Sequence, residues 1–162
     1  MMTVAVNQKS PGWTEKFKQM LKRQSGREVA VGFPKGTNNI ASPHYENGAS
    51  ILDVAIWNNF GTTRGIPERP FMTNAAPRLH KMFNKMVKDT QKAVNAGRIS
   101  EETVLKAAAL EGEAIVRQAI DAIVKPPNAP QTLKRKKSSS KPLIDSGAMR
   151  KYVKGVVRGR TR

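Results

Sequence analysis

The chain has 162 residues, of which 38% are hydrophobic and only 6% aromatic, and it contains no cysteine. This length suffices for one domain. The low hydrophobic content favours a subunit stabilised by its neighbours over a free enzyme. The lack of cysteine excludes disulfides, thiolate catalysis and cysteine-based zinc sites. The net charge is +17, and residues 125–162 hold 12 Lys and Arg against one acid, which predicts that they face a polyanion, an acidic protein or solvent.

The first predicted elements are a short amphipathic helix and a strand. Four apolar residues at helical spacing predict the helix: Trp13, Phe17, Met20 and Leu21. Alternating apolar residues then predict a half-buried strand over 28–33. Residues 35–48 are rich in turn formers and have no periodicity, so we expect an exposed loop there.

A capping signal marks the next helix. Ser50 has the character of an N-cap, and Asp53 stands three residues on, where a capping box needs its second partner. The apolar spacing that follows predicts a helix ended by Gly61. Residues 66–71 (IPERPF) are expected to form an extended connector, because Pro67 and Pro70 disfavour helix in the residue before them.

Two long helices follow in the predicted order. An apolar stripe at helical spacing starts at Pro77 and ends at Gly97. Ser100 then has the character of an N-cap for a second helix that runs to about residue 123. Small residues on this second helix, among them Gly112, would allow close approach of either the preceding helix or another subunit, and we expect the former.

The last quarter divides into an arm and a returning segment. Residues 125–142, rich in Pro, Lys and Ser, are expected to be extended and flexible when the protein is alone. Residues 143–162 should return to the body, with a cap at Asp145 or Ser146, a helical turn and a closing strand over 152–158. The fold class predicted is α+β, a single domain in which residues 1–124 form a body with a small antiparallel sheet packed against two long helices and shorter ones.

No residue pattern predicts catalysis. His44 and His80 each lack a second histidine or a carboxylate at metal-ligand spacing, and neighbouring acids such as Glu101 and Glu102 fit the positive end of a helix dipole. No nucleotide-binding or hydrolase motif is present in the sequence. We therefore expect no enzyme activity, no catalytic residues, no cofactor and no metal.

The run Lys134, Arg135, Lys136 and Lys137 is the strongest local charge and is expected to reach outwards. It could contact DNA phosphates, contact an acidic neighbouring protein, or simply be solvated, and these alternatives stay open. No aromatic residues are interleaved with it, so stacking on bases and sequence-specific recognition are not expected.

Three pairs of motifs, read in order, resemble the neck, head–tail joining and tail-completion proteins of tailed bacteriophages, a group that includes the minor tail protein Z type. They are VAVGF (29–33) with YENG (45–48), ILDVAIWNNFGT (51–62) with IPERPF (66–71), and PPNAP (126–130) with KPLIDSGAM (141–149). The resemblance implies a structural subunit of the virion, assembled in the host bacterial cytoplasm. It would form a homo-oligomeric ring at the tail top, joining the tail to the DNA-filled head.

The partners that the resemblance implies are the head-closure or connector proteins, the tail terminator and the tail tube, with possible non-specific contact to genomic DNA in the channel and no membrane. The candidate assembly contacts are Arg69, Phe71, Leu143 and Ile144. Two prolines stiffen the connector around Arg69 and Phe71. Phe71 could anchor in a neighbour's groove or complete its own core, while Leu143 and Ile144 are expected to be buried. A basic nucleic-acid-binding module is the alternative function.

Overall fold

The computed structural model describes residues 27–34, 48–136 and 139–159. The elements are β1 (Arg27–Gly32), α2 (Ile51–Phe60), α3 (Phe71–Asn95), α4 (Glu101–Ala122), α5 (Pro130–Arg135), α6 (Ala148–Tyr152) and β2 (Lys154–Gly159). The helix expected around residues 13–21 lies outside the described residues, as do residues 35–47 of the loop expected over 35–48. No helix in the described ranges is long and apolar enough to cross a membrane.

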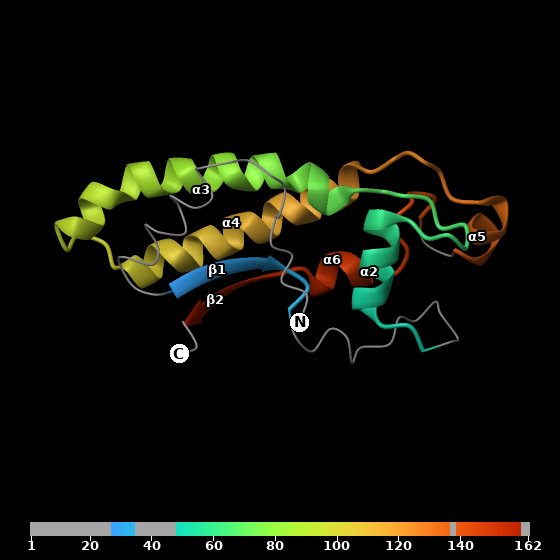
Figure 1. Ribbon diagram of the computed structural model, residues 1–162, viewed down its shortest axis with the longest axis horizontal. Coiled ribbons are helices and arrows are strands. Elements are labelled where there is room, and N and C mark those ends of the chain that lie inside the picture. The colour runs from blue at the N-terminus through green and yellow to red at the C-terminus, as the bar shows by residue number, and fades with distance from the viewer. Residues whose placement is uncertain (1–26, 35–47, 137–138, 160–162) are drawn as a thin grey trace.

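The long helices α3 and α4 form an antiparallel hairpin, and the two-stranded sheet packs against α4 (Figure 1). The short helices α2, α5 and α6 gather at the end of the molecule where α3 begins (Figure 1). β1 and β2 pair antiparallel, with Arg27 opposite Gly159 and Gly32 opposite Lys154. The predicted α+β fold, with a small antiparallel sheet and two long helices, is therefore confirmed.

The sheet comes close to α4 because glycines stand at the contact. A Cβ on Gly155 of β2 would lie 2.0 Å from the carbonyl oxygen of Ala109, and one on Gly112 of α4 would lie 2.7 Å from a methyl carbon of Val31. A Cβ on Gly112 would also meet Leu79 of α3. The expectation that Gly112 allows close packing within the chain is thus confirmed.

The core runs from the α3–α4 seam to the short helices. Its buried members are Val54, Ala55, Phe71, Met72, Ala75, Leu79, Ile115, Val116, Ala119, Ile120, Ile123, Leu143, Met149 and Val153. Phe71 has no exposed surface, and its ring meets that of Phe33 edge-on at 6.3 Å between centroids. Burying a side chain of this size contributes about 1.5–3 kcal/mol, so Phe71 ties the connector to the body.

Three predicted boundaries differ from the structure. α3 begins at Phe71 and not at Pro77, which lies inside the helix. The side chain of Asn59 in α2 accepts a hydrogen bond from the N–H of Met72 (3.0 Å) and so satisfies one of the donors that a helix start leaves free. α6 begins later than expected, after Gly147, whose positive φ of 74° replaces the cap predicted at Asp145 or Ser146. The arm expected to be extended over 125–142 contains the helix α5.

Candidate functional site

The guanidinium of Arg69 lies at the centre of a buried polar junction at the α2 end of the molecule. Arg69 is only 4% exposed, and its guanidinium donates hydrogen bonds to the carbonyls of Pro126 and Pro127 (both 3.0 Å). It also donates to the side-chain oxygens of Asn58 (3.0 Å) and Asn128 (3.5 Å). A planar fork of donors suits such a set of oxygens from different segments. Arg69 therefore joins α2, the connector and the chain that follows α4.

The turn after α2 fixes where Arg69 points. The backbone N–H of Arg69 donates to the Asn58 carbonyl (2.6 Å), and Thr62 and Ile66 exchange hydrogen bonds of 2.8 and 3.1 Å. Gly61 has a φ of 70°, and a Cβ there would lie 3.1 Å from the Glu68 nitrogen. This combination of positive φ and close backbone favours glycine at the turn. The segments NNFGT and IPERPF thus form one hydrogen-bonded unit.

A second unit closes the loop that carries α5. The side-chain amide of Asn128 donates to the carbonyls of Ser140 (3.1 Å) and Lys141 (3.4 Å), which brings the two ends of the loop together. The Lys136 ammonium donates to three carbonyls of the segment that follows the loop, those of Lys141, Pro142 and Ile144. Burial lowers the pKa of Lys136, Asp145 opposes this shift, and Arg69 adds to it.

These units border a cleft of about 830 Å³ between α2, the connector, α5 and residues 142–149. Arg69 and Lys136 line it, but the donors of both are directed at carbonyls of the same chain. A cation held in this way fixes backbone segments relative to one another and is not presented to a reactant. The arrangement is suited to holding a rigid junction.

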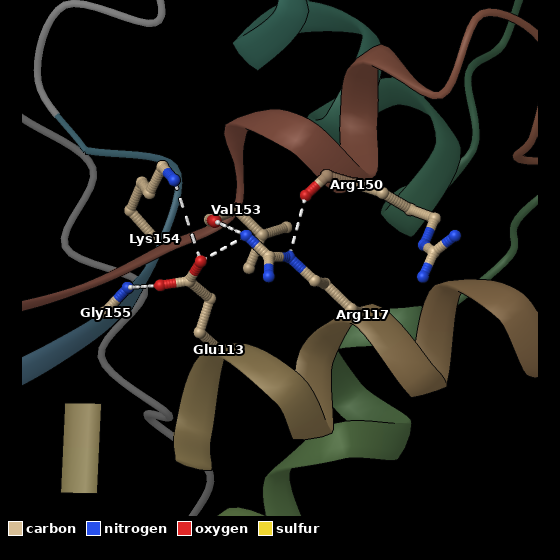
Figure 2. A network of polar contacts seen from close by, with 6 residues as sticks. All are labelled: Glu113, Arg117, Arg150, Val153, Lys154 and Gly155. Atoms are coloured by element: carbon tan, nitrogen blue, oxygen red, sulfur yellow. Dashed lines mark hydrogen bonds and ion pairs between the residues drawn. The ribbon is translucent and has the colours of Figure 1, made fainter. Parts of the chain in front are cut away.

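A second polar network crosses the other side of the core, around Glu113 of α4 (Figure 2). The Glu113 carboxylate accepts a hydrogen bond from the Gly155 N–H (3.2 Å), pairs with Arg117 and lies 3.7 Å from the Lys154 ammonium. Arg117 in turn donates to the carbonyls of Arg150 (3.1 Å) and Val153 (3.4 Å). Buried carboxylates are costly unless they are paired, and this one joins α4 to α6 and β2. Sequence reasoning missed this network, since Lys154 and Gly155 lie about 40 residues from Glu113 in the chain.

The predicted assembly contacts are mostly turned inwards. Arg69, Phe71 and Leu143 are buried in their own chain, and Ile144 is half-buried. Burial of Leu143 is confirmed, whereas Ile144 is less buried than expected. Of the two alternatives for Phe71, the structure has the one in which it completes its own core. A contact of these residues with a neighbour stays a prediction, and in this conformation it could act only through the surface that they position.

The predicted basic run is divided by the structure. Lys134 and Arg135 are exposed at the end of α5, as expected. The expectation that Lys136 reaches outwards is wrong, because its ammonium donates to carbonyls of residues 141–144. Lys137 lies outside the described residues. Whether this run contacts DNA or protein stays open.

The structure describes only one of the two histidines singled out in the sequence. His44 lies outside the described residues, and His80 is half-buried on α3, where burial lowers its pKa. No group of three or more His, Cys, Asp or Glu that could hold a metal occurs in the described residues. The predicted lack of enzyme activity stays a prediction.

Comparisons with protein-family models, with curated proteins and with solved structures found no match to this chain. The resemblance to phage neck and tail-completion proteins therefore stands on the motifs alone, and it too stays a prediction.

Proposed function

We propose that this chain is a structural subunit of a tailed bacteriophage, which forms a ring at the top of the tail and helps to join the tail to the DNA-filled head. Its location would be the virion, after assembly in the bacterial cytoplasm. Its partners would be like subunits and the head-closure, tail-terminator and tail-tube proteins. The proposal is supported by the three pairs of motifs in the sequence and by the contacts that residues of these motifs make in the fold.

The observation that carries the proposal is the convergence of the motifs. Asn58 belongs to the second pair of motifs, Arg69 to its connector, and Asn128 to the third pair, and all three side chains meet in one buried junction. These three buried polar side chains hold the connecting segments in one conformation. A subunit of a ring needs this, because every copy must present the same surface to its neighbours.

The junction also presents apolar side chains to solvent. Phe60, at the end of α2, is 59% exposed, and Val124, just after α4, is 61% exposed. Val124 lines a shallow groove together with Glu68 and Pro70 of the connector. Exposed large apolar groups beside a rigid segment are typical of protein–protein contacts. We therefore propose Phe60 and Val124 as contacts with a neighbouring subunit, in addition to the contacts predicted from the sequence.

Sedimentation velocity and negative-stain electron microscopy of the purified full chain test the proposal. Wild type should form closed rings as its concentration rises, and the double variant Phe60→Ser, Val124→Ser should stay monomeric. Leu110→Ser is the matched control, since Leu110 on α4 is 69% exposed but lies away from the connector, and it should leave the rings intact. A wild-type chain that stays monomeric at every concentration, with or without the other neck proteins, would contradict ring formation.

A further inference from the structure

The outer side of α3 carries a row of lysines. Lys81, Lys85, Lys88 and Lys92, here called the α3 lysine face, follow each other at spacings of four, three and four residues. At 3.6 residues per turn they point within about 60° of one another and extend over about 16 Å of helix. All four residues are exposed. α3 forms one edge of the molecule, with α4 lying between it and the sheet (Figure 1).

The side chains around the α3 lysine face are almost all polar. The other exposed positions at the same side of the helix are Asn74, Pro77, Arg78, Asn84, Asp89 and Asn95, of which Asp89 is acidic. None of the large apolar side chains that are exposed in the described residues belongs to α3. Protein–protein interfaces are depleted in lysine at their centres and rely on aromatic and apolar anchors. This face has the opposite composition.

The positive charge of the α3 lysine face is not neutralised by the described part of the chain. No ion pair there involves any of the four lysines. α3 holds five basic residues and one acid, Asp89. On α4, by contrast, Lys106 pairs with Glu102 and Arg117 with Glu113. A row of like charges without ion pairs among the described residues costs self-repulsion, which a bound polyanion would relieve.

We propose that the α3 lysine face binds the phosphate backbone of a nucleic acid without reading its sequence. Lysines are flexible point charges suited to phosphates, and phosphate contacts fix position and carry no base information. The spacing of about 4.5–6 Å along the helix lets neighbouring lysines reach successive phosphates of one strand. The inference does not depend on ring formation, and it places the contact on α3 instead of on the run Lys134–Lys137.

Fluorescence anisotropy with the purified full chain and a labelled duplex DNA of mixed sequence, across a salt series, tests the proposal. In the lysine-face variant, Lys81, Lys85, Lys88 and Lys92 are all changed to Gln. The matched control removes the same charge from exposed lysines elsewhere: Lys125, Lys134, Lys141 and Lys151. Circular dichroism and sedimentation on the same samples show that folding and assembly state are retained.

The lysine-face variant should bind duplex DNA at least about tenfold more weakly at low salt, and the slope of log affinity against log salt should fall by about four, roughly one for each lysine. The control should keep the wild-type slope. A duplex RNA of equal length shows which nucleic acid is preferred, and tight binding to either supports the proposal. Equal losses in both variants, wild-type affinity in the lysine-face variant, or preference for polyglutamate over both nucleic acids would overturn it.

Discussion

Arg69 shows how one buried side chain can connect segments that are far apart in the sequence. Its donors reach a side chain on α2 and carbonyls of the Pro126–Pro127 segment, which is nearly sixty residues further along the chain. Each acceptor would be left without its partner if the fork were removed. Because unsatisfied buried groups cost more than a made hydrogen bond gains, the junction depends on the shape of Arg69 as well as on its charge.

The substitution Arg69→Lys tests this dependence, since it keeps the charge and loses the fork. Lysine cannot reach all the oxygens that surround the guanidinium, so the free energy of unfolding should fall by about 2–4 kcal/mol. Urea denaturation measures it as a lower midpoint with an unchanged slope. The exposed Arg135→Lys serves as the control and should change stability by less than about 0.5 kcal/mol. A similarly small loss for Arg69→Lys would mean that the junction is held by other contacts.

Gly155 is the second residue on which the packing depends. An alanine there would place its Cβ against the Ala109 carbonyl, and backbone on both sides leaves little room to move. Gly155→Ala should therefore cost at least about 1–3 kcal/mol or prevent folding. Gly159→Ala, in the same strand and with no atom within 4 Å of the added Cβ, should be tolerated. Thermal unfolding followed by circular dichroism compares the two, and equal melting temperatures would show that β2 does not lie against α4 as described.

At the scale of elements, the start of α2 is the clearest local device. The Ser50 hydroxyl accepts from the Asp53 N–H (3.1 Å), and the Asp53 carboxylate accepts from the Ser50 N–H (2.9 Å). The Ser50 hydroxyl also donates to the Asp53 carboxylate (2.7 Å), and the two hydrogen bonds that this carboxylate accepts, from the hydroxyl and from the backbone N–H, lower the pKa of Asp53. A carboxylate whose pKa is lowered by folding stabilises the native state above its unfolded pKa, and this contribution is lost as the pH falls through the folded value.

Asp53→Ala should accordingly destabilise the protein by about 1 kcal/mol at neutral pH. The difference from wild type should shrink as the pH falls below about 4, because the carboxylate that the variant lacks becomes protonated in wild type as well. Chemical denaturation at a series of pH values follows the difference. Asp89→Ala, an exposed acid on α3, is the control. If the difference in free energy of unfolding between wild type and Asp53→Ala stayed constant into strong acid, the destabilisation would not come from the capping box.

How far the elements could be predicted depends on how local their causes are. The strand β1, the cap at Ser50 and the closing strand were predicted from neighbouring residues, and the structure confirms them. The start of α3 was missed because the side chain of Asn59 in α2 accepts a hydrogen bond from one backbone N–H of its first turn, that of Met72. Pro77 pointed to a later start, yet a proline is tolerated where tertiary contacts hold the helix around it.

The same reasoning applies to the candidate site. The motifs containing Arg69 and Asn128 were singled out from the sequence. The contact between these two residues could not be predicted, because no spacing pattern indicates a contact across almost sixty residues. Lys136 was expected to face solvent because its neighbours are charged. It is half-buried because the loop closes on itself, which brings carbonyls of residues 142 and 144 to the ammonium.

At the scale of the whole molecule, the structure separates three features in space. The hairpin of α3 and α4 with the sheet supplies the core, the Arg69 junction fixes the connectors at one end, and the α3 lysine face lies along one edge (Figure 1). In a ring, this division would let one surface hold neighbours while another faces a polyanion. The proposed function requires such a division, because a channel subunit must contact protein and tolerate passing DNA.

Cryo-electron microscopy of tailed particles that carry this chain tests the proposed function most directly. The proposal predicts a closed ring of copies between the head connector and the tail tube, with the junction around Phe60 and Val124 against the next copy. Particles that are complete and infectious without this chain, or density that places it outside the neck and tail top, would contradict it.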